Sequence, residues 1–555
     1  MIFFFYSFNL FLFSMINLFM SMIFLIKKLN FLFNWMIYMN NSLMIKFICF
    51  LDWMSLMFIS TIFFITSMVI LYSIEYMNSD LNIKRFMLLI LIFMMSMMLV
   101  IFSLNLMTIL LGWDGLGLSS YCLVIYYQNK KSYNSGMITI LMNRIGDIFI
   151  LISISILMQI NSWNFLFYNK FINLLMILIF ISAITKSAQI PFSTWLPLAM
   201  AAPTPISSLV HSSTLVTAGV YLLIRFNMLI SKNFLIIMLM ISSFTMFFSG
   251  ITANFEFDLK KIIALSTLSQ LGMMIFILSF NLPMLTFFHL INHAMFKSLL
   301  FLCSGIMIHN FSNNQDIRFI SMNNLYMPLI NMIFLMSSLT LCGMPFLTGF
   351  FSKDLIIEMF NMKFNNIFIF LIMYMSMGLT ISYSTRLMLY LNFKINKISI
   401  FLKLNIKNLM NFSIIILIFM TMFIGSMLNW LIFNSLNFIY LSKKLKLMIF
   451  NFLILGMMIG LMINKFKFFK NIFLLKNFKF FNLMFFLPLN FKKIKINFFK
   501  MNFYLNFIQD FGWNEFLLTK KFLHMINLNS NKFNKMNLFM LLISLYMIMF
   551  YMIFF

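Results

Sequence analysis

Apolar stretches of roughly 20 residues, separated by short polar segments, follow one another along the whole chain. A helix of that length spans the hydrocarbon core of a bilayer. The alternating strands of a membrane barrel are absent from the pattern, and a backbone in lipid must satisfy its own hydrogen bonds. The pattern therefore predicts an all-α polytopic membrane protein with about 15 or 16 transmembrane helices. The fifteen visible stretches are residues 1–26, 50–74, 86–103, 105–127, 137–159, 172–190, 206–228, 234–254, 261–280, 284–309, 327–348, 366–392, 411–438, 446–463 and 537–555.

The first stretch ends at Lys27 and Lys28 and has neither an Arg-rich amphipathic segment nor a small-residue cleavage site, so we expect it to be the first transmembrane helix. The chain also contains 78 Phe and 58 Met. The codons of these residues, like those of Ile, Asn and Lys, are rich in A and U. We infer an AT-biased genome, as organellar genomes often are, and the first stretch fits synthesis inside the organelle, although bacterial inner-membrane proteins look similar.

Small residues and prolines concentrate in the middle of the chain. All nine Ala lie between Ala183 and Ala294, and seven of the eight Pro lie between Pro191 and Pro345. Small residues allow close helix packing, whereas Pro interrupts helices where the backbone lines a cavity. Tight packing alone is one explanation of this composition. A site built from interrupted helices is the other.

Two of the apolar segments in this part are interrupted beside a lysine. Lys186 precedes Pro191 in TKSAQIPFSTWLP, and Lys353 follows Gly343 and Pro345 in GMPFLTGFFSKD. Broken helices in two halves of a membrane protein are typical of inverted-repeat transporters, whose site lies near the midplane. Burial disfavours the charged form of a lysine and so allows it to exchange a proton. Snorkelling of the side chain to the surface is the alternative.

Three ionisable residues form a polar stripe in the apolar segment FHLINHAMFKSLLF. His289, His293 and Lys297 are spaced by four residues, so a helix places them on one face. Histidine titrates near neutral pH, which favours proton handling. Metal binding by the histidine pair and structural hydrogen bonding are alternatives, although the zinc motif HExxH requires Glu where this chain has Leu290.

Few acids lie within the apolar stretches, and two of them are candidates to act on Lys186. Asp114 lies in LLGWDGLGLSSY, and Asp147 lies with Arg144 in NRIGD. A carboxylate near a lysine favours its charged form, so movement of such an acid would switch the lysine between proton uptake and release. Arg144 and Asp147 could instead pair with each other. His211, on the following span, could relay protons to or from Lys186.

Charge adds a second feature near the C-terminus. The net charge is +27, and between Lys394 and Lys535 there are 20 Lys and two acids. These lysines alternate with Phe, Leu and Ile, which predicts a basic amphipathic segment over residues 464–536 lying against a membrane or a partner. Because the charge flanks membrane spans and no recognition module accompanies it, a nucleic-acid partner is not expected.

The chain carries no pattern of its own for a metal or redox cofactor. Its four cysteines are far apart with no CxxC pair, and it has no Rossmann fingerprint. The glycines around Asp114 lie within an apolar span, so they do not form a phosphate loop.

Seven motifs together resemble the antiporter-like membrane subunits of respiratory complex I, and among them the NADH-ubiquinone oxidoreductase chain 5 family. The resemblance covers roughly residues 105–390 in order, and the HSST and SKD sequences, the composition and the C-terminal extension favour chain 5, of insect type. The motifs are GWDGLG, NRIGD, TKSAQIPFSTWLP, APTPISSLVHSSTLVTAGVYLLIR, KKIIALSTLSQLG, HLINHAMFKSLLFLCSG and GMPFLTGFFSKD.

The resemblance implies about 16 helices, two inverted five-helix repeats, a lateral amphipathic helix near the C-terminus and a hydrophilic axis through the spans. One departure is that most members of the family carry Glu where this chain has Asp114, which is one methylene shorter. The positions that match the family's proton-translocating residues are Asp114, Lys186, His211, His289, His293, Lys297 and Lys353, with Asp147 and Asp354 as modulators.

The resemblance also implies a function. The chain would be a multi-pass subunit in the mitochondrial inner membrane that translocates protons, driven by electron transfer from NADH to ubiquinone. Its partners would be other membrane-arm subunits, including sister subunits, and lipids such as cardiolipin; the assembly would use NADH, FMN, iron-sulfur clusters and ubiquinone. A multi-subunit sodium/proton antiporter and a structural clamp are the alternatives.

We expect the chain to divide into five parts. These are the N-terminal helices (residues 1–104), the translocating core (105–392), further helices (393–463), the lateral segment (464–536) and the last helix (537–555).

Overall fold

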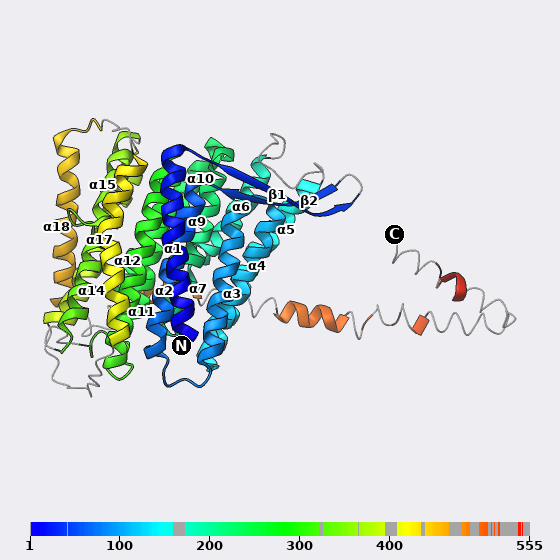
Figure 1. Cartoon of the computed structure of the whole chain (residues 1–555), viewed down its shortest axis with the longest axis horizontal. Coiled ribbons are helices and arrows are strands. Elements are labelled where there is room, and N and C mark those ends of the chain that lie inside the picture. Colours follow the sequence, from blue (N-terminus) through cyan, green and yellow to red (C-terminus); the bar gives the residue numbers. More distant parts are fainter. Residues whose placement is uncertain are drawn as a thin grey trace. The chain divides into compact units, whose positions relative to one another are not determined.

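The computed structural model of the chain divides into two units, Met1–Phe485 and Phe486–Phe555. The first unit holds the helices described below, and Figure 1 shows most of them standing side by side. The residues that the structure describes are 2–40, 43–158, 172–320, 326–363, 366–393, 408–433, 439–465, 480–488, 499–508, 512, 516, 520, 521, 542–545 and 547.

Among the described residues, twelve helical spans are long and apolar enough to cross a membrane, and two shorter apolar helices accompany them. Each of the fourteen apolar stretches predicted before residue 464 coincides with one of these helices. The full-length spans are α1 (Ile2–Lys27), α2 (Trp53–Tyr76), α3 (Ile83–Phe102), α4 (Leu106–Val124), α5 (Lys130–Met158), the continuous α8, η4 and α9 (Thr204–Ile206, Ser207–Thr214 and Leu215–Arg225), α10 (Lys232–Phe255), α11 (Leu259–Leu278), α12 (Pro283–Asn310), α16 with η6 (Ile367–Met388 and Leu389–Phe393), α17 (Asn408–Ile432) and α18 (Lys443–Lys465).

Two spans are broken, as the sequence predicts. The first consists of α6 (Ile172–Lys186), η2 (Phe192–Thr194), α7 (Trp195–Leu198) and η3 (Ala199–Ala201). The second consists of α14 (Pro328–Cys342) and α15 (Thr348–Lys363). The structure separates α15 from the preceding apolar stretch, because Gly343 ends α14 in the left-handed conformation with φ +82°. In Figure 1 α6 lies in the upper half of the helical unit and α14 in the lower half.

Ten of the spans form two sets of five, and the third span of each set is broken. The first set runs from α4 to α10 and the second from α11 to α17. Successive spans run in opposite directions, and each set has an odd number of spans, so the second set is inverted relative to the first (Figure 1). This arrangement confirms the predicted inverted repeats with two broken helices.

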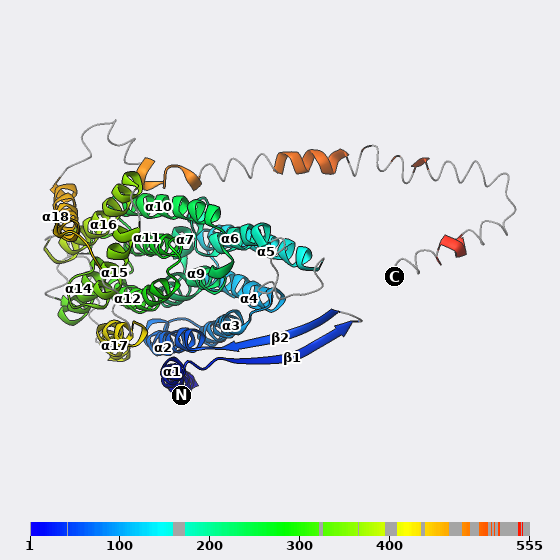
Figure 2. The same ribbon diagram turned by 90° about the horizontal axis from the view of Figure 1, so that it is seen from above.

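A β-hairpin between α1 and α2 is the departure from the all-helical expectation. Strand β1 (Phe31–Asn40) pairs antiparallel with β2 (Leu43–Leu51), and Figure 2 shows the pair extending past the helices on one side. The sequence did not reveal these strands because β1 is apolar at nearly every position and exposed on both faces, so no polar alternation marks them. The Asn-Asn-Ser sequence at residues 40–42 is the turn signal that could have been recognised.

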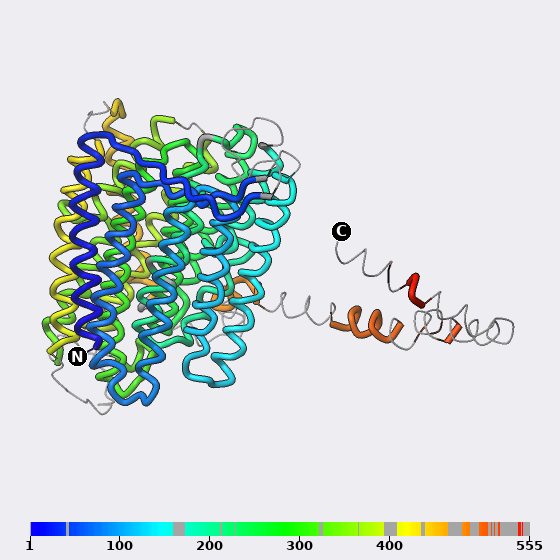
Figure 3. Tube along the Cα trace, turned by 45° about the vertical axis from the view of Figure 1, so that its right-hand side comes forward, coloured from blue at the N-terminus to red at the C-terminus, as the bar shows by residue number. Residues whose placement is uncertain are grey.

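Helix α12 lies at the centre of the first unit. It is buried along its length and packs against α11, α14, α15, α17 and η4, as the view from above in Figure 2 shows. The peripheral helices α1, α17 and α18 bury only 22%, 33% and 17% of their spans, as expected of surfaces that face lipid. Figure 3 traces α1, in dark blue, across the full height of this unit. The ionisable stripe on α12 is therefore kept far from lipid and water.

The C-terminal predictions are tested only in part. Most of residues 464–536 and 537–555 lie outside the described residues, so the lateral helix and the last span stay predictions. Within the first unit, Phe481 and Phe485 pack against Phe255 and Phe248 of α10, with ring centroids 5.1 and 4.6 Å apart.

Candidate functional site

Lys186, the last residue of α6, is fully buried. Its Nζ donates a hydrogen bond to the carbonyl oxygen of Trp113 on α4 at 3.1 Å and lies 5.2 Å from the centroid of the Trp113 ring. The last carbonyls of a helix lack partners within the helix and carry a partial negative charge. The end of α6 is therefore a favourable place for an ammonium group that no carboxylate touches.

Small residues and one indole position the end of α6. The Nε1 of Trp195 donates to the carbonyl of Thr185 at 2.9 Å, which satisfies one of the free carbonyls. A Cβ on Gly219 of α9 would lie 2.6 Å from the carbonyl oxygen of Ala183, so only glycine allows this approach of α9 to α6. The break in the first broken span is thus held by direct contacts from α7 and α9.

Two carboxylates lie near Lys186, but both pair with Arg144. One arginine nitrogen, Nη1 of Arg144, lies 3.6 Å from Asp114 and 3.6 Å from Asp147. The Asp147 side chain is 6% exposed, whereas those of Asp114 and Arg144 are 35% and 47% exposed. The structure therefore pairs Arg144 with both acids rather than with Asp147 alone. Both acids, and Arg144, act on the Lys186 ammonium through space.

The predicted stripe on α12 is fully buried. The Nδ1 of His289 is 2.9 Å from the Oγ of Ser352, and Nζ of Lys297 donates to the Oγ of Ser266 at 2.5 Å. The rings of His289 and His293 are 6.3 Å apart. The three ionisable residues thus share one face, as their spacing predicts, and the bond to Ser352 joins that face to α15.

Lys353, next to Ser352, bridges the break between α14 and α15. It is buried, and its Nζ donates to the carbonyl oxygen of Leu341 in the last turn of α14. Gly343 is required for its left-handed backbone and not for space, since a Cβ there would meet the Lys353 Cδ at 3.5 Å, an ordinary contact distance. Asp354 follows on the half-buried side of α15. Both broken spans therefore present a lysine that a main-chain carbonyl holds.

Several buried polar atoms around the stripe have no hydrogen-bond partner in the part of the chain that the structure describes. Buried polar groups are normally bonded, so these atoms retain hydrogen-bonding capacity. They include Nε2 of His289, both ring nitrogens of His293, Oε1 of Gln270 and Oγ1 of Thr348.

His211 lies in η4, the π-helical segment Ser207–Thr214. Its side chain is outside the described part of the structure, so its role stays a prediction. The segment continues directly into α9 and packs against α12 and α2. Single π-helical turns occur frequently at functional sites, and this one lies between the two broken spans.

Sequence reasoning missed Lys260, which is buried at the start of α11. Its Nζ donates to the carbonyl of Ala202 at 3.1 Å, while its neighbour Lys261 pairs with Asp258 at 2.6 Å. The pair of lysines in KKIIALSTLSQLG could have indicated this buried lysine. Two consecutive residues of a helix cannot share one face, so the two side chains must point to different surroundings. The buried ion pair of Asp52 and Arg225 was also missed, since 173 residues separate its members.

Three family models match consecutive parts of the chain. Residues 103–382 match the model described as NADH:quinone oxidoreductase/Mrp antiporter, TM. Residues 35–87 match NADH-Ubiquinone oxidoreductase (complex I), chain 5 N-terminus, and residues 383–555 match NADH dehydrogenase subunit 5 C-terminus.

Curated relatives are similar over most of the chain. The NADH-ubiquinone oxidoreductase chain 5 of Anopheles quadrimaculatus is 50% identical over 89% of this chain and 88% of its own length. That of Locusta migratoria is 53% identical over 78% of this chain and 77% of its own length. Among solved structures, the Mrp complex from Dietzia sp. DQ12-45-1b is similar in fold, with a TM-score of 0.68, 19% identity, and coverage of 82% of this chain and 53% of that one.

Proposed function

The chain belongs to the NADH-ubiquinone oxidoreductase chain 5 family and is a core membrane subunit of complex I, and from this we propose which of its residues carry the protons. One observation carries the proposal: two broken spans each hold a buried lysine, and a buried stripe of two histidines and a lysine leads to the second. Intramembrane ionisable residues are costly and usually mark ion or proton pathways.

The first half of the route is Lys186 with its acids. The carboxylates of Asp114 and Asp147 stabilise the Lys186 ammonium, and Arg144 opposes them. Because Arg144 touches both acids, a shift of Arg144 changes the field at Lys186 without breaking a direct lysine salt bridge. This arrangement lets a small movement switch Lys186 between holding and releasing a proton.

The second half is the stripe and Lys353. Ser352 joins His289 to the helix that carries Lys353, so a proton can pass between α12 and α15. Positive charges on Lys297 and Lys353 disfavour each other, so a proton arriving at one promotes release from the other. We assign proton exchange with one side of the membrane to Lys353, with Asp354 as its modulator, and the relay between the halves to His211.

We further propose the setting of this route. The chain acts in the mitochondrial inner membrane beside antiporter-like sister subunits, and its basic C-terminal segment binds anionic lipid such as cardiolipin. NADH, FMN, iron-sulfur clusters and ubiquinone belong to other subunits of the assembly, since the four cysteines here are far apart in the sequence. A sodium/proton antiporter is the second candidate, and the likeness in fold to the Mrp complex supports it.

Substitution of either broken-span lysine tests the proposed route. Lys186→Met and Lys353→Met replace the lysine by an unbranched side chain one atom shorter that carries no titratable group, so we expect assembled complex that moves fewer protons per NADH oxidised. Proton uptake and NADH oxidation are measured together in sealed membrane particles. The control is Lys130→Met, because Lys130 is exposed at the start of α5. A normal proton-to-NADH ratio in either test variant would overturn the assignment.

A further inference from the structure

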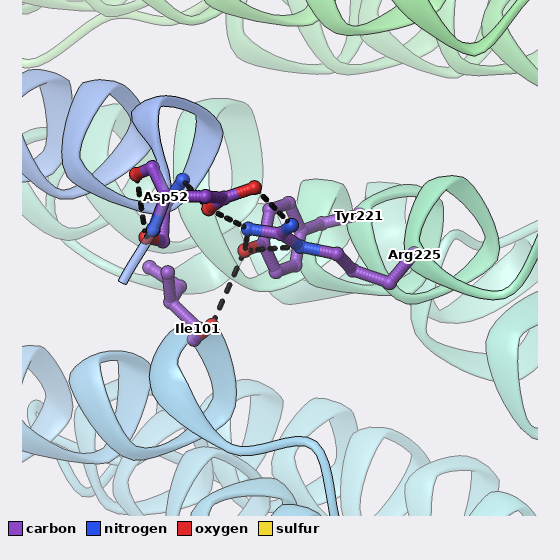
Figure 4. Close-up of polar contacts among 5 residues, drawn as sticks. Asp52, Ile101, Tyr221 and Arg225 are labelled. Atoms are coloured by element: carbon purple, nitrogen blue, oxygen red, sulfur yellow. Dashed lines mark hydrogen bonds and ion pairs between the residues drawn. The ribbon is translucent and has the colours of Figure 1, made fainter. Parts of the chain in front are cut away.

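A polar network outside the proposed route joins three helices, and Figure 4 shows it. Arg225, the last residue of α9, donates to both carboxylate oxygens of Asp52 at 2.6 Å. Its Nε and Nη2 also donate to the hydroxyl of Tyr221, at 2.8 and 2.6 Å. The Tyr221 hydroxyl in turn donates to the carbonyl of Ile101 on α3 at 3.2 Å.

The carboxylate of Asp52 also caps helix α2. Asp52 is the N-cap of α2, and its Oδ1 accepts a hydrogen bond from the backbone N–H of Ser55 at 2.9 Å. The same side chain therefore caps the N-terminus of α2 and binds Arg225 at the end of α9. Both members of the ion pair are shielded, since the side chains of Arg225 and Asp52 are 12% and 9% exposed.

The network is nearly saturated, which distinguishes it from the atoms of the proton route. The guanidinium donates four hydrogen bonds and lies over the rings of Phe50 and Tyr221, with its carbon 5.3 and 5.0 Å from their centroids. Arginine stays charged in proteins, and the Tyr221 hydroxyl commits its proton to Ile101. These groups are thus suited to hold a position rather than to carry protons.

The helix held in this way touches the proposed route. Helix α9 is continuous with η4 and packs on the end of α6, where Gly219 meets Ala183 and Ser187, the neighbour of Lys186. An axial shift or rotation of α9 would move η4 and this contact together, because an α-helix behaves as a stiff rod over eleven residues. The position of α9 therefore determines the surroundings of Lys186 and of the π-helical segment.

We propose that Asp52, Tyr221 and Arg225 are positioning residues for proton translocation, which anchor the end of α9 to α2 and α3 and so keep η4 and the end of α6 in register. This inference rests on the proposed role of Lys186. The three residues act through α9, and none of them exchanges a proton in the transport cycle.

Arg225→Lys is the primary test. Lysine keeps the charge, but it cannot donate in a fork to Asp52 and bind Tyr221 at the same time. We expect the complex to assemble and to move fewer protons per NADH oxidised. The matched control is Arg318→Lys, which removes the same kind of fork from an exposed ion pair with Asp316, and we expect it to leave the ratio unchanged.

Tyr221→Phe provides the second variant. It removes the bond to Ile101 and the two bonds that Arg225 donates to the hydroxyl, but it leaves the Asp52–Arg225 ion pair, so we expect a smaller loss in the same ratio. A structural role alone would lower the amount of assembled complex but leave the ratio normal. A normal ratio in both variants, or failure of both to assemble, would overturn the inference. If Lys186→Met itself pumps normally, the proposed route fails instead, which separates the two proposals.

Discussion

The two broken-span lysines are each held by a main-chain carbonyl and not by a carboxylate. Lys186 donates to Trp113 on a neighbouring helix, and Lys353 donates to Leu341 across its own break. A carbonyl accepts from an ammonium group but does not neutralise it, so the charge remains sensitive to more distant groups. In the proposed route the acids near Lys186 therefore act on it by their field, and one of them can be altered without a loss of direct contact to the lysine.

Asp114 is the residue at which this control can be measured. Replacement by Asn removes one negative charge near Lys186 and leaves Arg144 with Asp147 alone, so the Lys186 ammonium becomes less stable. We expect Asp114→Asn to lower the proton-to-NADH ratio and Asp114→Glu to preserve it, since the longer carboxylate also reaches Arg144. Asp80→Asn, in the loop between α2 and α3, is the control. Equal ratios in the Asn and Glu variants would refute the field argument.

At the scale of elements, the break in each span depends on one or two special residues. The end of α14 requires the left-handed conformation of Gly343, with φ +82°. That conformation returns the chain toward α15 and leaves Leu341 free to accept from Lys353. The break and the lysine contact are therefore two consequences of one glycine.

Gly343→Ala should weaken this element. A Cβ in the left-handed region costs about 1–2 kcal/mol, whereas Asn tolerates the region better. We expect the heat inactivation temperature of the assembled complex to fall in Gly343→Ala and to fall less in Gly343→Asn. The measurement is residual proton translocation after heating of membrane particles. An Asn variant that is less stable than the Ala variant would contradict the role assigned to the backbone.

For the whole molecule, the hydrophobic pattern was sufficient to predict the spans and the burial of the stripe, whereas the two inverted five-helix repeats followed from the family resemblance. Length and apolarity alone identify a membrane helix, and helical spacing places His289, His293 and Lys297 on one face. The same reasoning could not find the hairpin, because β1 is apolar and exposed on both faces and therefore shows no alternation. It could not find the partners of Arg225 or Lys260 either, because both contacts join residues far apart in the sequence.

From the division of the chain into two units, we expect proton translocation and assembly to depend on different segments. All nine candidate residues lie in Met1–Phe485, whereas residues 486–555 carry eight Lys and two acids and cannot neutralise that charge among themselves. We expect such a segment to bind an anionic partner, lipid or protein. Truncation after Phe485 retains the aromatic contacts with α10, so we expect the shortened chain to insert into the membrane but to be lost from the assembled complex. Native electrophoresis with detection of both species measures this, with a chain in which the eight lysines are replaced by Gln as the matched variant. Normal assembly of both would show that the basic segment is not a brace.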